Sequence, residues 1–144
     1  MRLRGLLIVV LLLTTVVACG SDPDVETGGS RPGPAAPGGV DLSKAEFEDL
    51  TAEAKPEVDA VDNVFKAKYI EVKVGTAVTF RNDGRNTHNV LPVEGVEFGA
   101  IQAADFEPGA EATITFDEAG DHPYYCSLHG TTTKGMTGAV RVVE

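Results

Sequence analysis

Apolar residues recur at every second position in several short runs between Glu57 and the end of the chain. Alternation of this kind covers residues 69–74, 78–81 and 111–116, and a last apolar run covers residues 138–143. Clusters of Gly, Pro, Asn and Asp separate these runs as turns. A period of two is typical of a strand with one buried face. Many short strands in one segment predict an all-β fold for residues 57–144, an antiparallel β-sandwich or barrel.

The first residues of the chain have the features of an export signal. Arg2 and Arg4 precede an almost unbroken apolar run over residues 6–17, which is too short to span a bilayer as a mature helix. Small residues then lead to Cys19, in a pattern that resembles the lipobox of bacterial lipoproteins. In such proteins the cysteine thiol is diacylated and becomes the new N-terminus. We therefore expect residues 1–19 to be a lipoprotein signal peptide with lipidation at Cys19; an ordinary signal peptide is the alternative.

The segment after the signal peptide, residues 20–40, is rich in Gly, Pro and Asp and almost free of apolar residues. This composition predicts a disordered tether, because the segment cannot bury enough surface to offset the entropy of ordering.

Removal of the signal peptide takes away Arg2 and Arg4, so the formal net charge of −10 falls to about −12. Such a surface repels nucleic acid and anionic headgroups and could steer the protein toward a basic partner, but the acidic residues are scattered, which favours a plain solvated surface.

Residues 41–56 carry a helix-start pattern. Ser43 and Glu46 have the spacing of a capping box, and Leu42 and Phe47 are placed as a hydrophobic staple. The pattern predicts a short helical lead-in between the tether and the β-domain. Its few apolar positions indicate weak packing, and we assign it no function.

The cysteine count leaves one thiol to explain. The chain has two cysteines, and lipidation of Cys19 leaves Cys126 alone in an exported domain. Cys126 therefore cannot form an internal disulfide. A reactive nucleophile, an intermolecular bridge and a metal thiolate remain as explanations.

Four residues together indicate a metal site. His88 follows one predicted strand, Cys126 and His129 lie at the end of another, and Met136 precedes the last. Each alone has a structural explanation, such as a surface histidine or a core methionine. As a set they form the trigonal His2Cys site with a weak axial Met that is typical of blue copper. They predict one copper ion that cycles between Cu(I) and Cu(II). Zinc is a weaker alternative, because an axial methionine adds little for that metal.

Several segments carry a resemblance to a known family. They are residues 60–65 (AVDNVF), 70–80 (IEVKVGTAVTF), 87–90 (THNV), 125–129 (YCSLH) and 135–138 (GMTG). Over about residues 57–144 the chain resembles the cupredoxins, above all their plastocyanin-like branch. The resemblance implies a Greek-key β-sandwich. It places His88, Cys126 and His129 as equatorial ligands of the copper ion, with Met136 as the axial ligand.

The resemblance also implies roles for two neighbouring residues. Asn89 resembles the residue that tethers the cysteine-bearing loop by hydrogen bonds, and Tyr125 resembles a tyrosine proposed as a second electron route. The connection from His129 to Met136 has six residues, where plastocyanin-type proteins usually have four, so the axial distance and the exposure of the site are open. We expect His122 to be structural.

The resemblance implies a one-electron carrier and not an enzyme. A copper-delivery or copper-storage protein is the alternative, although such sites favour Met-rich exposed ligands and the mature chain has one methionine. Copper enzymes with a second centre need more histidines than the three present. The binuclear centre of cytochrome oxidase needs two cysteines in the domain.

These inferences together give a place and a set of partners. We expect an extracytoplasmic monomer, lipid-anchored to the bacterial cell membrane, which exchanges electrons with unidentified redox proteins at the membrane surface. Nucleic acid is not an expected partner.

Overall fold

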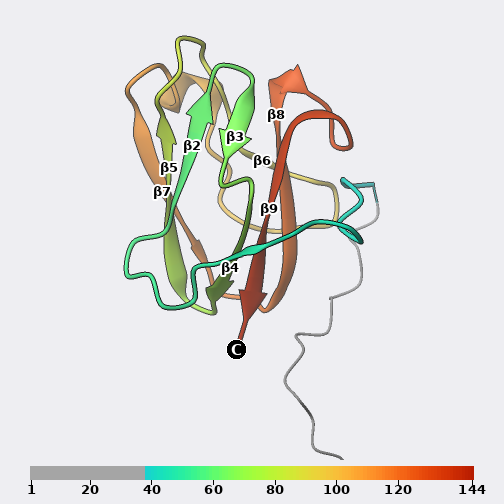
Figure 1. Ribbon diagram of the computed structural model, residues 1–144. Coiled ribbons are helices and arrows are strands. Elements are labelled where there is room, and N and C mark those ends of the chain that lie inside the picture. The colour runs from blue at the N-terminus through green and yellow to red at the C-terminus, as the bar shows by residue number, and fades with distance from the viewer. Residues whose placement is uncertain (1–37) are drawn as a thin grey trace, which may run out of the picture.

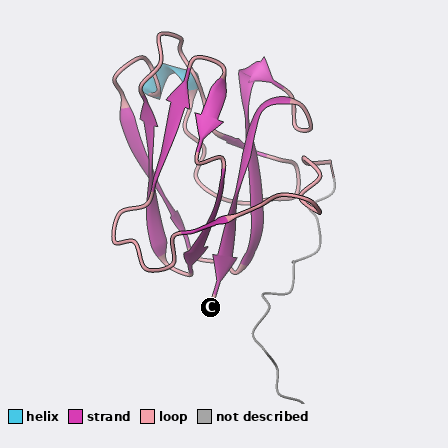
Figure 2. Ribbon diagram, in the orientation of Figure 1, coloured by secondary structure: helices cyan, strands magenta, loops and turns pink. Residues whose placement is uncertain are grey.

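The computed structural model describes residues 38–144, in which two β-sheets pack against each other (Figures 1 and 2). The predicted signal peptide, Cys19 and the predicted tether up to residue 37 lie outside the described residues. Among residues 38–144, no helix is long and apolar enough to cross a membrane. The all-β sandwich predicted from the alternating runs is confirmed.

The described part of the chain contains nine strands and one helical turn, joined by loops. The five-stranded sheet has the order β1 (Glu48–Asp49), β4 (Tyr69–Lys73), β9 (Gly135–Val143), β8 (Gly120–Gly130) and β6 (Leu91–Pro92). The four-stranded sheet has the order β3 (Val64–Lys66), β2 (Glu57–Val61), β5 (Thr76–Asn82) and β7 (Glu111–Phe116). The helical turn is the 3-10 helix η1 (Ala103–Asp105).

Both sheets are mixed: beside the antiparallel pairs expected from the sequence, they contain parallel pairs. β1 pairs with β4, β4 with β9, and β2 with β5, all in parallel. The other pairs are antiparallel. An alternating sequence shows which face of a strand is buried, but it carries no information on the neighbour's direction. Long connections between the paired strands supply the crossovers that parallel pairs require.

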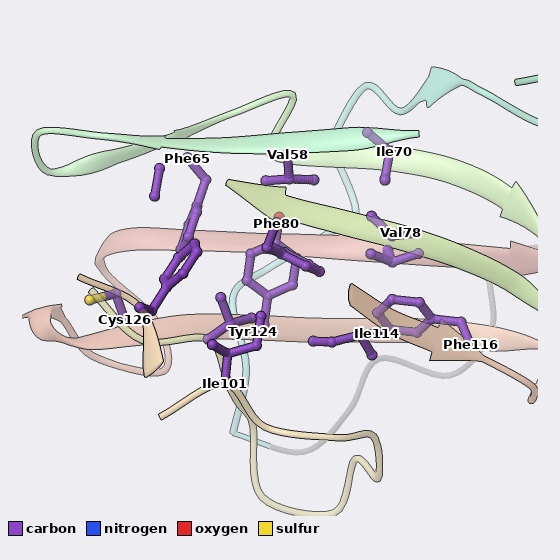
Figure 3. Close-up of a cluster of buried hydrophobic side chains, with 14 of the residues drawn as sticks. Val58, Phe65, Ile70, Val78, Phe80, Ile101, Ile114, Phe116, Tyr124 and Cys126 are labelled. Carbon is purple, nitrogen blue, oxygen red and sulfur yellow. The ribbon is translucent and has the colours of Figure 1, made fainter. Parts of the chain in front are cut away.

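The apolar side chains of the alternating runs form one core between the sheets (Figure 3). The predicted inward positions of three strands are buried: Ile70 and Val72 of β4, Val78 and Phe80 of β5, and Ile114 and Phe116 of β7. Full burial of such a side chain contributes about 1.5–3 kcal/mol. Cys126 lies at one end of the cluster and Phe116 at the other (Figure 3). The core therefore ends at the predicted metal ligands.

The helix predicted within residues 41–56 is wrong. The segment forms turns and the short strand β1. Ser43 does not cap a helix; its backbone N–H donates to the carboxylate of the aspartate two residues earlier, at 2.9 Å. The ring of Phe47 packs against Tyr69, and the guanidinium carbon of Arg141 lies 3.8 Å from its centroid. An extended chain reaches both partners and the edge of β4, and these contacts override a weak helical propensity.

This lead-in is packed onto the five-stranded sheet. Leu42 is buried, and a Cβ added at Gly39 would lie 3.3 Å from the Cγ atom of Pro123. Arg141, which stacks on the lead-in, donates two hydrogen bonds to the carboxylate of Asp121, at 2.7 and 3.1 Å. These hydrogen bonds raise the pKa of Arg141. Figure 1 shows the lead-in crossing in front of β9.

Candidate metal centre

The thiol of Cys126 lies between two imidazoles. Its Sγ atom is 3.7 Å from Nδ1 of His88 and 3.7 Å from Nδ1 of His129. The potential ligand atoms of these residues lie within 4.8 Å of one another, and the two ring centroids are 4.8 Å apart. The structure thus brings three of the four predicted ligands together. Within residues 38–144 this is the one group of three or more His, Cys, Asp or Glu side chains that could hold a metal ion.

One strand and one loop supply these three side chains. Cys126 and His129 belong to β8, whereas His88 lies in the loop that follows β5. Cys126 and His88 are fully buried, and His129 is half-buried. His129 is therefore the member of the group that solvent reaches.

A bulge in β8 brings the ligands of that strand to one point. The regular pairing of β8 with β9 stops after Tyr125 opposite Thr137 and resumes at Gly130 opposite Gly135. Between these pairs, residues 126–129 of β8 face the single residue Met136 of β9. Extra residues on one strand bend it and redirect its side chains. Met136, which is only 1% exposed to solvent, lies opposite the segment that carries Cys126 and His129.

Asn89 connects the His88 loop to the Cys126 strand. Its Nδ2 atom donates to Oγ of Ser127 at 2.9 Å, and its Oδ1 atom accepts from the backbone N–H of Ser127 at 2.8 Å. The tethering contacts predicted for Asn89 are therefore present. They fix two segments whose sequence separation is 38 residues.

Residues 52–143 match the family described as copper binding proteins, plastocyanin/azurin family. That match covers well over half of the chain. The chain belongs to the plastocyanin/azurin family of copper-binding proteins.

Two plastocyanins are identical to the chain at about one residue in three over the aligned segment. The plastocyanin of Daucus carota is 32% identical over 98 residues, which cover 63% of this chain and 99% of that protein. The chloroplastic plastocyanin of Tetradesmus obliquus is 33% identical over 98 residues, 63% of this chain. The chain spans 66% of that protein, which is just under two thirds of its length.

A solved structure of the same family agrees with the fold. A mutant of amicyanin in its reduced form matches with a TM-score of 0.54 and 30% identity, over 63% of this chain and 84% of that chain. The resemblance to plastocyanin-like cupredoxins inferred from the sequence is confirmed.

The donor set of this family member fits copper. With the bond lengths of zinc sites, about 2.3 Å to sulfur and about 2.0–2.1 Å to nitrogen, a sulfur and a nitrogen donor at about 110–120° on one ion are about 3.5–3.8 Å apart. The two distances of 3.7 Å from the Cys126 sulfur to the imidazole nitrogens fall in this range. A soft thiolate with two imidazoles in a buried site suits copper.

The environment of His88 favours the neutral imidazole, which is the form of histidine that binds a metal. Burial lowers the pKa of His88, and the neighbouring His129 lowers it further. Its Nε2 atom is buried and has no hydrogen-bond partner among residues 38–144. A doubly protonated ring would therefore leave a charged N–H group buried and unpaired.

Asn82 is a residue near the site that the sequence interpretation missed. It is fully buried, and its Nδ2 atom donates to the carbonyl oxygen of Phe106 at 2.9 Å. The backbone N–H of His88 donates to the same carbonyl, at 3.1 Å. Asn82 thus holds the carbonyl that anchors the His88 backbone. Its position before Asp83-Gly84 at the end of a strand indicated only a turn.

The remaining predicted residues have more peripheral positions. Tyr125 is half-buried in β8 next to Cys126, and its role as an electron route stays a prediction. The Nε2 atom of His122 lies 2.8 Å from the carbonyl oxygen of Glu118, and its ring packs against Phe116. These contacts agree with a structural role for His122.

Proposed function

We propose that this protein is an extracytoplasmic one-electron carrier that uses a single type 1 copper ion. His88, Cys126 and His129 are its equatorial ligands in this proposal, and Met136 is the axial ligand. The observation that carries the proposal is the convergence of the Cys126 sulfur with two Nδ1 atoms, each at 3.7 Å, at the end of the core where Cys126 lies.

Copper, when bound, supplies a couple between Cu(I) and Cu(II) that exchanges one electron. The chain holds its donors in a fixed arrangement through backbone contacts. The β8–β9 pairs on either side of the bulge hold the segment that carries Cys126 and His129, the Phe106 carbonyl fixes the backbone of His88, and Asn89 joins the two segments. Donors held in this way keep the same positions in both oxidation states, which lowers the energy needed to reorganise the site.

Burial favours electron transfer over the alternative of copper delivery or storage. A delivery site has to present exposed ligands to the acceptor of the metal. Here Cys126 and His88 are fully buried, whereas solvent reaches His129. The half-buried imidazole gives an electron a short path to a partner while the metal stays enclosed.

An absorption spectrum of the full chain with Cu(II) tests the proposal. The wild-type protein is expected to show a strong visible band from charge transfer between thiolate and copper. Cys126→Ser is expected to lose this band and remain folded. Cys19→Ser, which alters the other cysteine, is the matched control and is expected to keep it. A colourless wild-type protein, or a Cys126→Ser variant as intensely coloured as wild type, contradicts the proposal.

The location is part of the proposal and rests on the sequence alone. Diacylation of Cys19 would hold the protein at the bacterial membrane surface, because two acyl chains bind stably where one binds marginally. The proposed partners are redox proteins at that surface. In a bacterial host, Cys19→Ala is expected to move the protein from the membrane fraction to the soluble fraction. Unchanged membrane association of this variant contradicts the anchor.

A further inference from the structure

The connection between His129 and Met136 folds back on itself in a way that its length does not suggest. Gly130 and Gly135 pair with each other as part of the β8–β9 ladder. Beyond them, the backbone N–H of Thr131 donates to the carbonyl oxygen of Lys134 at 2.8 Å. The N–H of Lys134 also donates to Oγ1 of Thr131, at 3.2 Å. Residues 131–134, which we call the hairpin tip, are thus closed off from the ligands by the glycine pair.

Each glycine of the pair lies against a predicted ligand residue on the opposite strand. A Cβ atom added at Gly130 would lie 2.7 Å from the backbone nitrogen of Met136, 2.8 Å from the carbonyl oxygen of Lys134 and 3.2 Å from that of Met136. A Cβ atom added at Gly135 would lie 2.7 Å from the carbonyl oxygen of His129 and 2.9 Å from Cα of Gly130. Gly135 also has a φ of +82°, a conformation that glycine adopts without strain. These contacts involve backbone atoms, so the strands would have to separate to admit a side chain.

We propose that the Gly130–Gly135 pair positions Met136 as the axial ligand, and that the hairpin tip is not part of the copper site. The inference rests on the proposed function, since it takes Met136 as the axial ligand. The hairpin tip lies beyond the glycine pair, so the ladder controls the distance between His129 and Met136. Gly130 and Gly135 are positioning residues, because they act through Met136 and His129.

The first test measures the reduction potential and the visible and electron paramagnetic resonance spectra of the copper-loaded full chain. Met136→Leu is expected to raise the potential, because loss of a donor destabilises Cu(II) more than Cu(I). Gly130→Ala is expected to raise the potential in the same direction by a smaller amount, because it moves the Met136 backbone away from the bulge. Gly135→Ala is also expected to raise the potential by a smaller amount than Met136→Leu, because it displaces the backbone of His129.

A double-variant cycle separates positioning from general distortion. In the Met136→Leu background, Gly130→Ala is expected to cause no further shift in potential, because the donor that the glycine positions is gone. Equal shifts of potential by Gly130→Ala in the wild-type and Met136→Leu backgrounds overturn the inference.

Two control variants address folding and the hairpin tip. Gly75→Ala has a comparable φ of +80° but open space around the added Cβ, so it is expected to lower stability without altering the spectra or the potential. Replacement of residues 131–134 by Asn-Gly, which favours a two-residue hairpin turn, is expected to leave the spectra and the potential unchanged. This replacement keeps the test valid if the glycine variants do not fold. A shift as large as that of Met136→Leu from the tip replacement overturns the inference.

The outcomes distinguish this inference from the proposed function. If Met136→Leu shifts the potential and neither glycine variant does, the positioning role is wrong while the axial ligand stands. If Met136→Leu shifts neither the potential nor the spectra, the assignment of Met136 as axial ligand is wrong, and the positioning role falls with it.

Discussion

Replacement of the buried Asn82 by alanine is expected to lower the free energy of unfolding by about 3 kcal/mol. The Nδ2 atom of Asn82 donates to the carbonyl oxygens of Phe106 and Asn86, each at 2.9 Å. Its Oδ1 atom accepts from the backbone N–H of Gly84 at 3.1 Å. A hydrogen bond contributes a net stability of about 1 kcal/mol, and alanine removes all of these contacts. The position is fully buried, so solvent does not readily replace the lost partner.

Urea unfolding of the metal-free wild type and Asn82→Ala measures this difference directly. Because a loss of 1 kcal/mol lowers Tm by about 4–8 °C in a domain of this size, thermal unfolding is expected to shift downward by about 12–24 °C. Asn86→Ala is the matched control. The Asn86 side chain is exposed and makes one hydrogen bond of 3.4 Å, to Asn63, so its loss is expected to change stability by less than about 0.5 kcal/mol.

The same variant tests the connection between Asn82 and the copper site. The Phe106 carbonyl that Asn82 holds also accepts the backbone N–H of His88. Asn82→Ala is therefore expected to weaken copper binding, measured by competition with a chelator, whereas Asn86→Ala leaves it unchanged. Equal unfolding free energies for Asn82→Ala and Asn86→Ala would refute this account of the buried hydrogen bonds.

Three further predictions follow from the described contacts. Removal of copper is expected to lower Tm by about 16–32 °C, because a ligand bound only by the native state stabilises it by about 4 kcal/mol at a thousandfold excess over Kd and each kcal/mol corresponds to about 4–8 °C; identical Tm values contradict a native-state site. The metal-free protein is expected to lose stability as pH falls below about 6.5, because the pKa of His88 is lowered on folding and the unfolded chain binds the proton first. His88→Gln is expected to reduce this pH dependence, and an unchanged slope in urea unfolding contradicts the assignment. Gly138→Ala is expected to destabilise the fold by about 1–3 kcal/mol in the same assay, because the added Cβ would collide with the buried ring of Tyr124; stability equal to wild type contradicts this packing.

The alternating pattern predicted the strands because burial of one face of a strand requires an apolar residue at every second position. Val78 and Phe80 are buried, as the period of two requires. Val74 fits the same pattern yet is 41% exposed, because β4 ends at Lys73 and the turn at Gly75 begins there. The pattern marks inward positions but not the ends of a strand.

The helix predicted within residues 41–56 failed because the deciding contacts are remote in the sequence. Phe47 stacks on Arg141, and β1 pairs with β4. Neither partner is visible from the capping-box spacing of Ser43 and Glu46. The parallel pairing of β4 with β9 was hidden for the same reason.

The candidate site was largely predictable because its chemistry depends on residue types that are scarce in this chain. The structure brings His88, Cys126 and His129 together. The supporting residue Asn82 could not be found in this way, because a buried asparagine and a turn asparagine look alike in sequence. The bulge opposite Met136 was also hidden, because strand register depends on pairing across the whole of β8 and β9.

The bulge of β8 has a consequence for the order in which the site assembles during folding. His129 is three residues from Cys126, whereas His88 is 38 residues from it. Contacts between neighbours in sequence form sooner, because a short loop loses less entropy on closure. The β8–β9 hairpin therefore gathers Cys126, His129 and Met136 early, and the docking of the His88 loop comes later. We expect the closure of the two sheets over the core, which docks the His88 loop, to limit the rate at which the chain becomes able to hold its metal.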